Sequence, residues 1–339
     1  MIDLLVAGAG PVGLVTAINA KLSGLDVTVA EPREGAIDKA CGEGLMPDSL
    51  ARLAALGVDP PGRDFRGIRY VSGTSVAEAR FKGGPGRGVR RTALQPALMD
   101  RANELGVKFV QARVESIVQD ADGISAVGIR SRYLIGADGL HSQVRRSLGL
   151  DEPVHGRQRF GVRQHFAVAP WSDMVEVHWL ADGELYVTPV GDDLVGVAVL
   201  GTAPMQLDAA ISRVPELAER LAGVRVASTP RGAGPLRQQA SRRTSGHGLL
   251  VGDAAGYIDA LTGEGLSVGF AEAEAAVRTI VAGTPHRYES EWRTITRSYR
   301  WLTSGLLWTT SRPALRPMVV PAARAWPWAF RQVVNRLAY

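Results

Sequence analysis

The stretch Ile2-Asp3-Leu4-Leu5-Val6-Ala7-Gly8-Ala9-Gly10-Pro11-Val12-Gly13 decides the fold of this 339-residue chain. Its apolar first half predicts a buried strand of a parallel sheet, and apolar side chains at helical spacing continue to about residue 22. Gly8 permits a tight turn, Gly10 lets the backbone approach a pyrophosphate, and Gly13 lets the helix pack closely on the strand. We therefore predict a dinucleotide site at the N-terminus of this helix.

An acidic residue follows the second predicted strand, residues 25–30. Glu31 lies 21 residues after Gly10, where a carboxylate can accept hydrogen bonds from ribose hydroxyls. Pro32 and Arg33 come directly after it and are expected to contact the same ligand. The alternative is a glycine-rich turn in some other parallel sheet, which would lack this combination of strand, glycines, helix, strand and acid.

Two later segments repeat the pattern of a strand that ends in glycine and aspartate. Residues 133–139 end in Asp138-Gly139, and residues 248–256 contain Gly252-Asp253 at the end of an apolar run. An aspartate at a strand end, beside small residues, can bind the hydroxyls of a ribityl chain. The turn that precedes the next predicted helix, residues 266–281, exposes backbone amides that can stabilise negative charge on a reduced flavin ring.

The three motifs, in this order, resemble those of the FAD-dependent superfamily of para-hydroxybenzoate hydroxylase-type monooxygenases, geranylgeranyl reductases and flavin-dependent halogenases. The resemblance covers about residues 1–285. It implies an α/β fold in which a glutathione-reductase-type FAD-binding Rossmann domain is interrupted by a mixed or antiparallel sheet that binds substrate. FAD is the implied cofactor. Because no second dinucleotide fingerprint follows residue 31, NADPH or NADH is expected only as a transient reductant.

The resemblance also implies roles for single residues. Glu31 binds the adenosine ribose, Asp253 holds the ribityl chain, Arg91 contacts the flavin and the backbone at Val114 meets the adenine; alternatively, Arg91 is a surface residue at a helix start. The expected cofactor contacts are Gly8, Gly10, Pro11, Val12, Gly13, Glu31, Pro32, Arg33, Gly42, Glu43, Arg91, Val114, Asp138, Gly139, Gly252, Asp253, Gly263, Gly265 and Leu266.

The segment Cys41-Gly42-Glu43-Gly44-Leu45-Met46-Pro47 occupies the place of a glycine-rich loop in the halogenases and reductases. Its glycines would let the backbone lie over the flavin ring. Cys41 is the candidate catalytic residue, as a proton donor or substrate contact; the competing interpretation is a small packed hydrophobic residue.

Alternating apolar and polar residues predict an inserted sheet. Antiparallel strands are expected at residues 159–168, 174–180, 184–190 and 194–200, with turns between them. We expect an FAD-binding domain made of residues 1–64, 91–150 and 240–285, a substrate domain made of 65–90 and 151–239, and a C-terminal segment, 286–339. The candidate substrate-lining residues are His165, His178, Trp179, Tyr186 and Pro189.

Composition excludes several classes of protein. The chain is 45% hydrophobic and 22% charged, which is typical of a globular protein. A single cysteine permits neither an intramolecular disulfide nor an iron–sulfur cluster, and no metal-ligand cluster stands out. The absence of a basic, apolar leader at Met1 and of any apolar run of 18 residues favours a cytoplasmic protein, either free or peripheral to a membrane.

The positive net charge of +5 belongs to the C-terminal end. Residues 292–339 contain eight arginines, five of the seven tryptophans and no Asp, Glu or Lys, so residues 1–291 carry 31 basic and 34 acidic residues, a net charge of −3. This tail either folds back over the substrate domain or contacts a membrane surface. The slightly acidic body argues against a nucleic-acid partner. The sequence gives no oligomeric state.

We predict an FAD-dependent oxidoreductase that consumes NAD(P)H and acts on a hydrophobic small molecule. The sequence favours hydroxylation of a phenolic, polyketide or lipid-tailed aromatic substrate. The alternatives are reduction of double bonds in isoprenoid chains and, less favoured, a non-catalytic lipid or prenyl-protein escort. The sequence argues against halogenation, because the Trp-x-Trp-x-Ile-Pro motif of the halogenases is absent.

Overall fold

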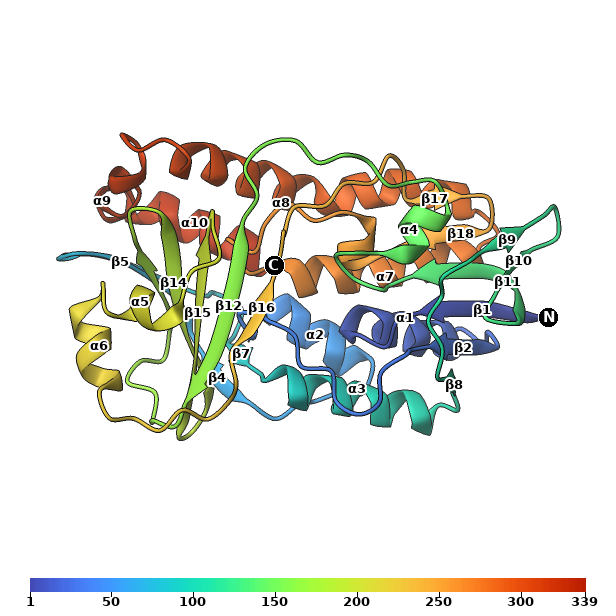
Figure 1. Ribbon diagram of the computed structural model, residues 1–339, viewed down its shortest axis with the longest axis horizontal. Coiled ribbons are helices and arrows are strands. Elements are labelled where there is room, and N and C mark those ends of the chain that lie inside the picture. Colours follow the sequence, from blue (N-terminus) through green and yellow to red (C-terminus); the bar gives the residue numbers. More distant parts are fainter.

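A computed structural model describes residues 1–339 and shows two large sheets side by side along the long axis of the molecule (Figure 1). The first sheet has eight strands, with β1 (Ile2–Ala7) at its centre. β1 pairs in parallel with both of its neighbours, and the order is β17-β18-β11-β1-β2-β8, with the β9–β10 hairpin attached to β11. The other strands are β2 (Val27–Ala30), β8 (Lys108–Val110), β9 (Val118–Gln119), β10 (Ile124–Ala126), β11 (Ile129–Gly136), β17 (Thr244–Ser245) and β18 (Gly248–Leu250).

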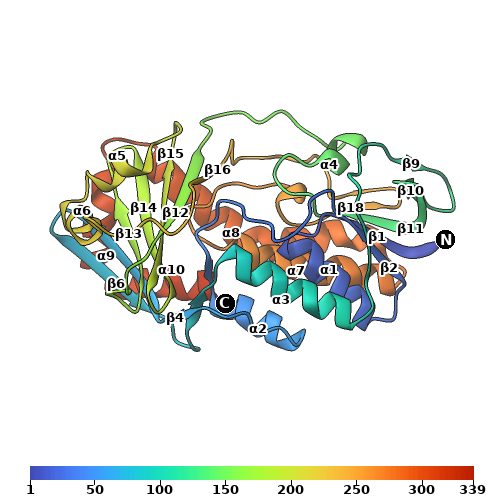
Figure 2. The ribbon, with the colours of Figure 1, turned by 60° about the horizontal axis from the view of Figure 1, so that its bottom comes forward.

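Three long helices cover one face of this sheet and lie side by side in Figure 2. They are α1 (Pro11–Leu22), α3 (Arg91–Glu104) and α7 (Gly265–Val281), with α1 in contact with both of the others. Pro11 at the first helical position fits α1 because a helix start needs no amide donor there. Eight of the twelve α1 residues are buried, which explains why this helix shows little polar face in the sequence.

The second sheet has seven strands in the order β16-β12-β15-β14-β13-β5-β6. The four antiparallel strands expected from alternation are present as neighbours, with ends within two residues of the prediction. They are β12 (Phe160–Phe166), β13 (Val175–Trp179), β14 (Gly183–Gly191) and β15 (Leu194–Gly201), and the sheet is completed by β5 (Gly67–Ser72), β6 (Ser75–Arg80) and β16 (Arg231–Ala233). The sheet is mixed, because β13 and β5 pair in parallel.

Short elements connect the two sheets. A three-stranded sheet is formed by β3 (Gly44–Leu45), β4 (Arg63–Phe65) and β7 (Gly86–Gly88), next to α2 (Pro47–Ala55). The helix α4 (Gln143–Ser147) and the 3-10 turn Gly252–Ala255 follow β11 and β18. The helices α5 (Leu207–Ile211) and α6 (Pro215–Leu221) pack on the second sheet, and together they form a separate core of 13 buried residues.

The C-terminal tail is helical and folds back over the second sheet. α8 (Tyr288–Thr310) runs for 23 residues before the first tail proline, and α9 (Val319–Ala325) and α10 (Pro327–Ala338) then pack against β6. Val320, Phe330 and Val334 of the tail join a core that includes Phe65 and Trp179. The tail therefore folds back over the substrate domain, which is one of the two alternatives that the sequence left open. None of the helices combines the length and the apolar character needed to cross a bilayer.

Candidate active site

A single cavity of about 1110 Å³ extends from the first sheet to the second and is lined by all three glycine–acid motifs. The lining includes Gly8 and Gly10 after β1, Asp138 and Gly139 after β11, and Asp253 after β18. Carboxyl ends of neighbouring parallel strands meet at one edge of a sheet, which is where open α/β sheets bind ligands. The parallel pairing of β1, β11 and β18 thus brings together turns that are more than a hundred residues apart in the sequence.

The three glycines of the first turn have different surroundings. Gly8 has φ +105°, and a Cβ there would lie 2.7 Å from the Ala137 carbonyl oxygen. A Cβ on Gly13 would lie 1.9 Å from the Gly8 carbonyl oxygen, so the helix could not start where it does. A Cβ on Gly10 would meet no protein atom within 4 Å. Packing therefore requires Gly8 and Gly13, whereas only a ligand in the cavity would require Gly10.

Glu31 directly follows β2, and its carboxylate is fixed and charged. Its Oε2 accepts a hydrogen bond from the Ala9 amide at 2.9 Å, and its Oε1 accepts one from Arg33 Nε at 2.7 Å. Burial opposes the charge, but the bonds from Arg33 and Ala9 outweigh it and lower the pKa of Glu31. Pro32, Arg33 and Val114 line the same end of the cavity.

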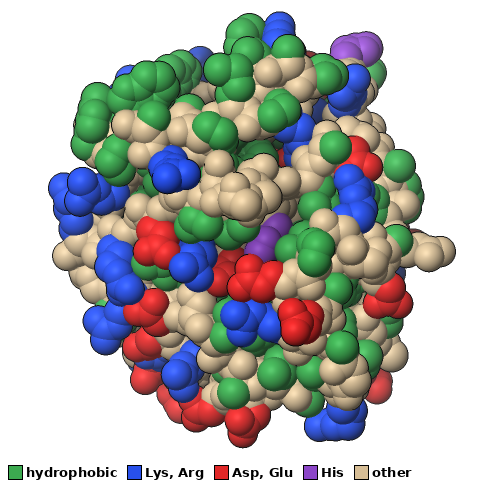
Figure 3. Space-filling model, turned by 90° about the vertical axis from the view of Figure 1, so that its left-hand side faces the viewer, with side chains coloured by type: hydrophobic (Ala, Val, Ile, Leu, Met, Phe, Trp, Pro, Cys, Tyr) green, Lys and Arg blue, Asp and Glu red, His purple; other side chains and the backbone are tan.

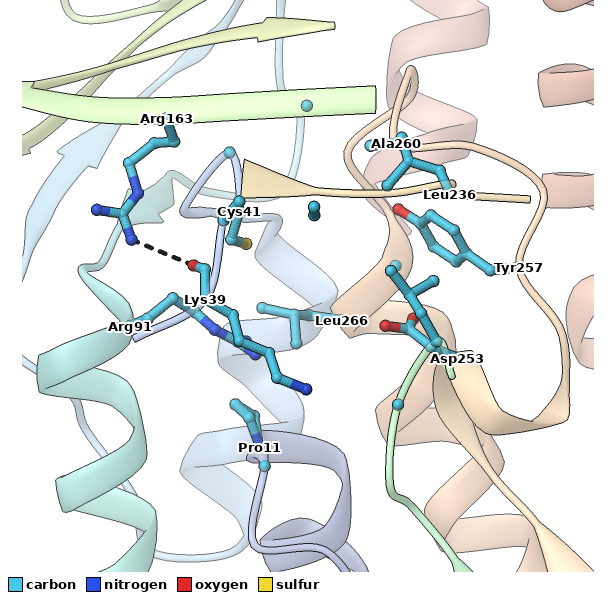
Figure 4. Close-up of a pocket in the computed structure, with 18 of the residues that line it drawn as sticks. Pro11, Lys39, Cys41, Arg91, Arg163, Leu236, Asp253, Tyr257, Ala260 and Leu266 are labelled. Atoms are coloured by element: carbon cyan, nitrogen blue, oxygen red, sulfur yellow. Dashed lines mark hydrogen bonds between the residues drawn. The ribbon is translucent and has the colours of Figure 1, made fainter. Parts of the chain in front are cut away.

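Charged side chains face one another across the middle of the cavity. Figure 4 shows Lys39 extending from its loop toward Asp253, with Pro11 and Arg91 close to it. Burial raises the pKa of Asp253, while the positive charges of Lys39 and Arg91 oppose this rise. Lys39 was not predicted from the sequence, because a single lysine in a loop carries no motif. Its Nζ lies 3.0 Å from the position that a Cβ on Gly139 would take, directly above the second glycine–acid turn.

Several polar groups in this region have no protein partner and so test whether FAD fits. The Nε and Nη1 atoms of Arg91 are buried without a hydrogen bond, and the Asp253 carboxylate accepts none from the protein. Buried donors and acceptors are normally satisfied, so their partners are expected to be ligand atoms. Together with the open space at Gly10, these groups fit a dinucleotide with phosphates and hydroxyls along its length.

The loop that carries Cys41 lies over the cavity. Cys41 lines the cavity (Figure 4). Its Sγ accepts a hydrogen bond from the Glu43 amide at 3.4 Å. Glu43 has φ +59°, which is unusual for a residue with a side chain. Its carboxylate accepts hydrogen bonds from the Arg91 amide at 3.1 Å and from His165 Nε2 at 2.6 Å. Glu43 thus ties the loop to α3 and β12. It also lines the cavity, and its expected contact with the cofactor stays a prediction.

Two further segments place expected cofactor contacts at the cavity. Gly42 lines the cavity from the Cys41 loop, and Gly263, Gly265 and Leu266 line it at the N-terminus of α7. Gly252 does not line it: a Cβ there would lie 3.2 Å from the Val12 side chain. Its amide donates to Glu272 Oε2 at 2.6 Å. Glu272 is 2% exposed, and burial raises its pKa to about 8. The sequence analysis did not single out this acid, and its hydrogen bond to Gly252 supports the turn rather than a ligand.

The end of the cavity beneath the second sheet is largely apolar. Its walls come from the second sheet, from β4, from the connecting loops and from α10 of the tail. They include Phe65, Ile68, Tyr70, Phe160, Val162, Val175, Val177, Tyr186, Leu200, Leu236, Leu261, Val334 and Leu337. The phenol of Tyr186 donates to the Leu261 carbonyl at 3.0 Å, so its polar tip is already satisfied.

Four of the five residues expected to line this end do not line it, and only Tyr186 does. His165 is buried between Glu43 and Ser228, and His178 lies 3.4 Å from Glu176. The other two are Trp179, which packs edge-on against Tyr70, and Pro189, whose carbonyl is covered by the backbone at Gly88. Alternation correctly separates the faces of a strand, but it does not tell which face a loop or helix will cover.

Arg163 is a cavity residue that the sequence prediction omitted. It shares a strand face with His165, and its Nη2 donates to the Lys39 carbonyl at 3.1 Å (Figure 4). The same nitrogen donates to Asp38. Its Nη1 is 3.1 Å from His165 Nδ1. The guanidinium therefore fixes the loop of residues 38–43 against β12, beside the point where the two ends of the cavity meet.

Comparison with known proteins shows the family. Residues 1–284 match the FAD binding domain family, and the chain belongs to it. A menaquinone reductase of Mycolicibacterium smegmatis is 29% identical over 333 residues, which cover 88% of this chain and 80% of that protein. A digeranylgeranylglycerophospholipid reductase of Methanosarcina acetivorans is 27% identical, over 87% of this chain and 81% of that protein.

The fold is shared with solved structures of flavoproteins. The p-nitrophenol 4-monooxygenase of Pseudomonas putida DLL-E4 superimposes with a TM-score of 0.77 and 18% identity, covering 99% of this chain and 98% of that one. The protein is therefore an FAD-dependent oxidoreductase of this family, and the expected fold class is confirmed.

Proposed function

We propose that this protein uses NADPH or NADH to reduce carbon–carbon double bonds in the isoprenoid chain of a lipid-like substrate. The observation that carries the proposal is the apolar end of the cavity, whose wall side chains offer an extended chain many contacts and few hydrogen-bond partners. Both curated relatives above are named as reductases, and the name of one states a geranylgeranyl lipid as its substrate. These findings shift our preference from hydroxylation, which the sequence alone favours, to reduction.

The reaction balances without a further oxidant. The nicotinamide gives up a hydride, one alkene carbon gains a hydride, and the other alkene carbon gains a proton from an acid. A bound FAD would supply hydride-transfer chemistry between the nicotinamide and the alkene. Asp253, Arg91 and Lys39 would hold the cofactor, and the apolar walls would exclude water and orient the chain.

Cys41 is the proposed proton donor. Its thiol lies on the cavity wall, in the loop that Arg163 and Glu43 fix against β12. The Glu43 amide donates to Cys41 Sγ, so the negative charge left on sulfur after proton transfer would be stabilised. Solvent can restore the proton between turnovers.

Hydroxylation of an aromatic ring is the second candidate, and one observation favours it. Removal of a phenol proton needs a polar relay next to the substrate, and the hydrogen-bonded set of Arg163, His165, Glu43 and Ser228 lies beside the cavity. The Cys41 thiol would then be a substrate contact rather than an acid.

Anaerobic turnover separates the two. Purified protein with bound FAD would be given NADPH and either a geranylgeranyl lipid or a prenylated phenol, with and without dioxygen, and the products weighed by mass spectrometry. If the protein is a reductase, the product is two mass units heavier than the substrate, both with and without dioxygen. A product sixteen units heavier, formed only with dioxygen, would replace the reductase proposal with the hydroxylase. Protein that stays colourless with added FAD would reject both in favour of a binding role.

A further inference from the structure

The C-terminal tail carries an exposed aromatic face that the cavity does not use. Trp301 and Trp308 of α8 are 76% and 57% exposed, and Met318, Trp326 and Trp328 are 59–65% exposed. Single exposed apolar residues are common on soluble proteins, but five large ones in one segment indicate an interaction surface. We call these five residues the aromatic face.

Helix geometry places arginines next to the tryptophans of α8. Four exposed residues of α8 lie along one side of this helix: Arg293, Arg297, Trp301 and Trp308. Arg312 follows two residues after the end of the helix and is also exposed. The buried residues lie on the opposite side: Trp292, Thr296, Tyr299 and Thr303. The Arg312 guanidinium is centred 3.6 Å from the Trp308 ring, so charge and indole are presented together.

The positive charge of the tail is mostly uncompensated. Residues 292–339 contain no acidic residue, and of their eight arginines only Arg293 and Arg316 form ion pairs, with Glu289 and Glu184. Figure 3 shows hydrophobic side chains gathered on the upper part of the end that carries α9, whereas the acidic side chains in this view lie mostly lower down. The face is thus both apolar and cationic, and the rest of the chain is slightly acidic.

We propose that the aromatic face docks on an anionic lipid bilayer. Indole rings partition into the interface between headgroups and acyl chains, and guanidiniums bind the headgroup phosphates, so this combination of residues matches such a surface. A flat bilayer engages one side of the molecule and leaves the acidic body in solution. This membrane contact goes beyond the proposed function. It rests on that function only for the idea that the substrate comes from the bilayer.

The tail also joins this surface to the cavity. Val334 and Leu337 of α10 line the apolar end of the cavity, and the same helix begins at the exposed Trp326 and Trp328. Arg336 of α10 donates to Ser298 Oγ of α8 at 3.2 Å, which holds the two helices together. A protein docked through the tail would therefore have one wall of its substrate cavity made by the element in contact with lipid.

Vesicle sedimentation tests the proposal. Full-length protein would be mixed with vesicles of phosphatidylcholine alone or of phosphatidylcholine with 30% phosphatidylglycerol. The variants are R297E/R312E, which reverses charge beside the aromatic face, and W301S/W308S/W326S/W328S, which removes its indoles. The control R157E/R225E makes the same change of net charge at two exposed arginines without ion pairs, far from the tail in sequence.

The proposal predicts that wild-type protein and the control sediment with anionic vesicles, and that each tail variant loses at least tenfold in partition coefficient. Equal sedimentation of the tail variants and the control would overturn it. A wild-type dimer that the indole variant dissociates, with vesicle binding unchanged, would assign the face to a second copy instead. Turnover of detergent-dispersed substrate should be equal in all four proteins, so a failed reductase assay and failed docking are distinguishable.

Discussion

At the scale of single residues, Gly10 and Gly13 of the first motif have different physical reasons to be glycine. Gly13 is required by the folded chain, since any Cβ there would collide with the Gly8 carbonyl. Gly10 has ordinary helix-start dihedral angles and open space, so the fold alone would accept alanine. The expected dinucleotide, and not packing of the chain, therefore explains why residue 10 is glycine.

This difference predicts opposite outcomes for two one-carbon changes. Gly13→Ala should lower the free energy of unfolding of the cofactor-free protein by roughly 2–4 kcal/mol, or prevent folding. Gly10→Ala should leave that free energy within about 0.5 kcal/mol and weaken FAD binding at least tenfold. Urea unfolding and titration with FAD, followed by flavin fluorescence, measure the two quantities. Unchanged FAD binding in Gly10→Ala would mean that no phosphate lies at this turn.

Glu31 provides a second test of the cofactor site. Glu31→Gln removes the charge that ribose hydroxyls would bond, and FAD affinity should fall by roughly 1.5–3 kcal/mol, the usual cost of losing hydrogen bonds to a charged acceptor. Glu34→Gln is the matched control, because Glu34 is exposed and accepts only from Gln111. Equal FAD affinity in both variants would show that the adenosine end lies elsewhere.

At the scale of elements, the connection between α8 and α9 is held by one arginine. Arg316 Nε donates to the Leu180 carbonyl at 2.6 Å, and its Nη2 donates to Glu184 at 2.6 Å. Glu184 is fully buried and also pairs with Arg159. Loss of Arg316 would leave the buried Glu184 carboxylate and the Leu180 carbonyl without one of their hydrogen-bond donors. Such a loss is costly in a low-dielectric interior.

Arg316→Ala should therefore destabilise the protein by roughly 2–4 kcal/mol and loosen the tail. Arg312→Ala is the control, since Arg312 donates only to the Trp308 carbonyl on the surface. Thermolysin digestion should cut the Arg316 variant in the tail well before the control. Identical digestion patterns and urea midpoints would show that α9 and α10 are held by apolar packing alone.

At the scale of the whole molecule, buried acids without counter-charges make stability depend on pH. Glu264 at the start of α7 is 7% exposed, one of its carboxyl oxygens has no partner, and burial raises its pKa to about 8. In the unfolded chain this group titrates near 4.5. Between these values the folded protein holds a proton that the unfolded chain has released, so stability is greatest below pH 4.5 for this group and falls as the pH rises.

Glu264→Gln should remove this dependence, which amounts to at most about 1.4 kcal/mol per pH unit between pH 4.5 and 8. In urea unfolding at pH 5, 6, 7 and 8, the free energy of unfolding of the variant should rise relative to that of the wild type at each step in pH. Glu272 contributes in the same direction and stays in both proteins. The exposed Glu274→Gln is the control; parallel curves for all three proteins would mean that Glu264 titrates normally when folded.

The sequence by itself determined β1, β2, β11 and β18 of the first sheet, the four antiparallel strands, the glycine–acid motifs and the charge of the tail, because these follow from local periodicity and short-range backbone geometry. Lys39, Arg163 and Glu272 could not be predicted in this way, since each is a single polar residue without a motif. Only the tertiary structure decided that β12 turns His165 toward Glu43, and that α10 supplies one wall of the cavity. Which face of an element is covered depends on residues distant in the chain, and local patterns carry no information about them.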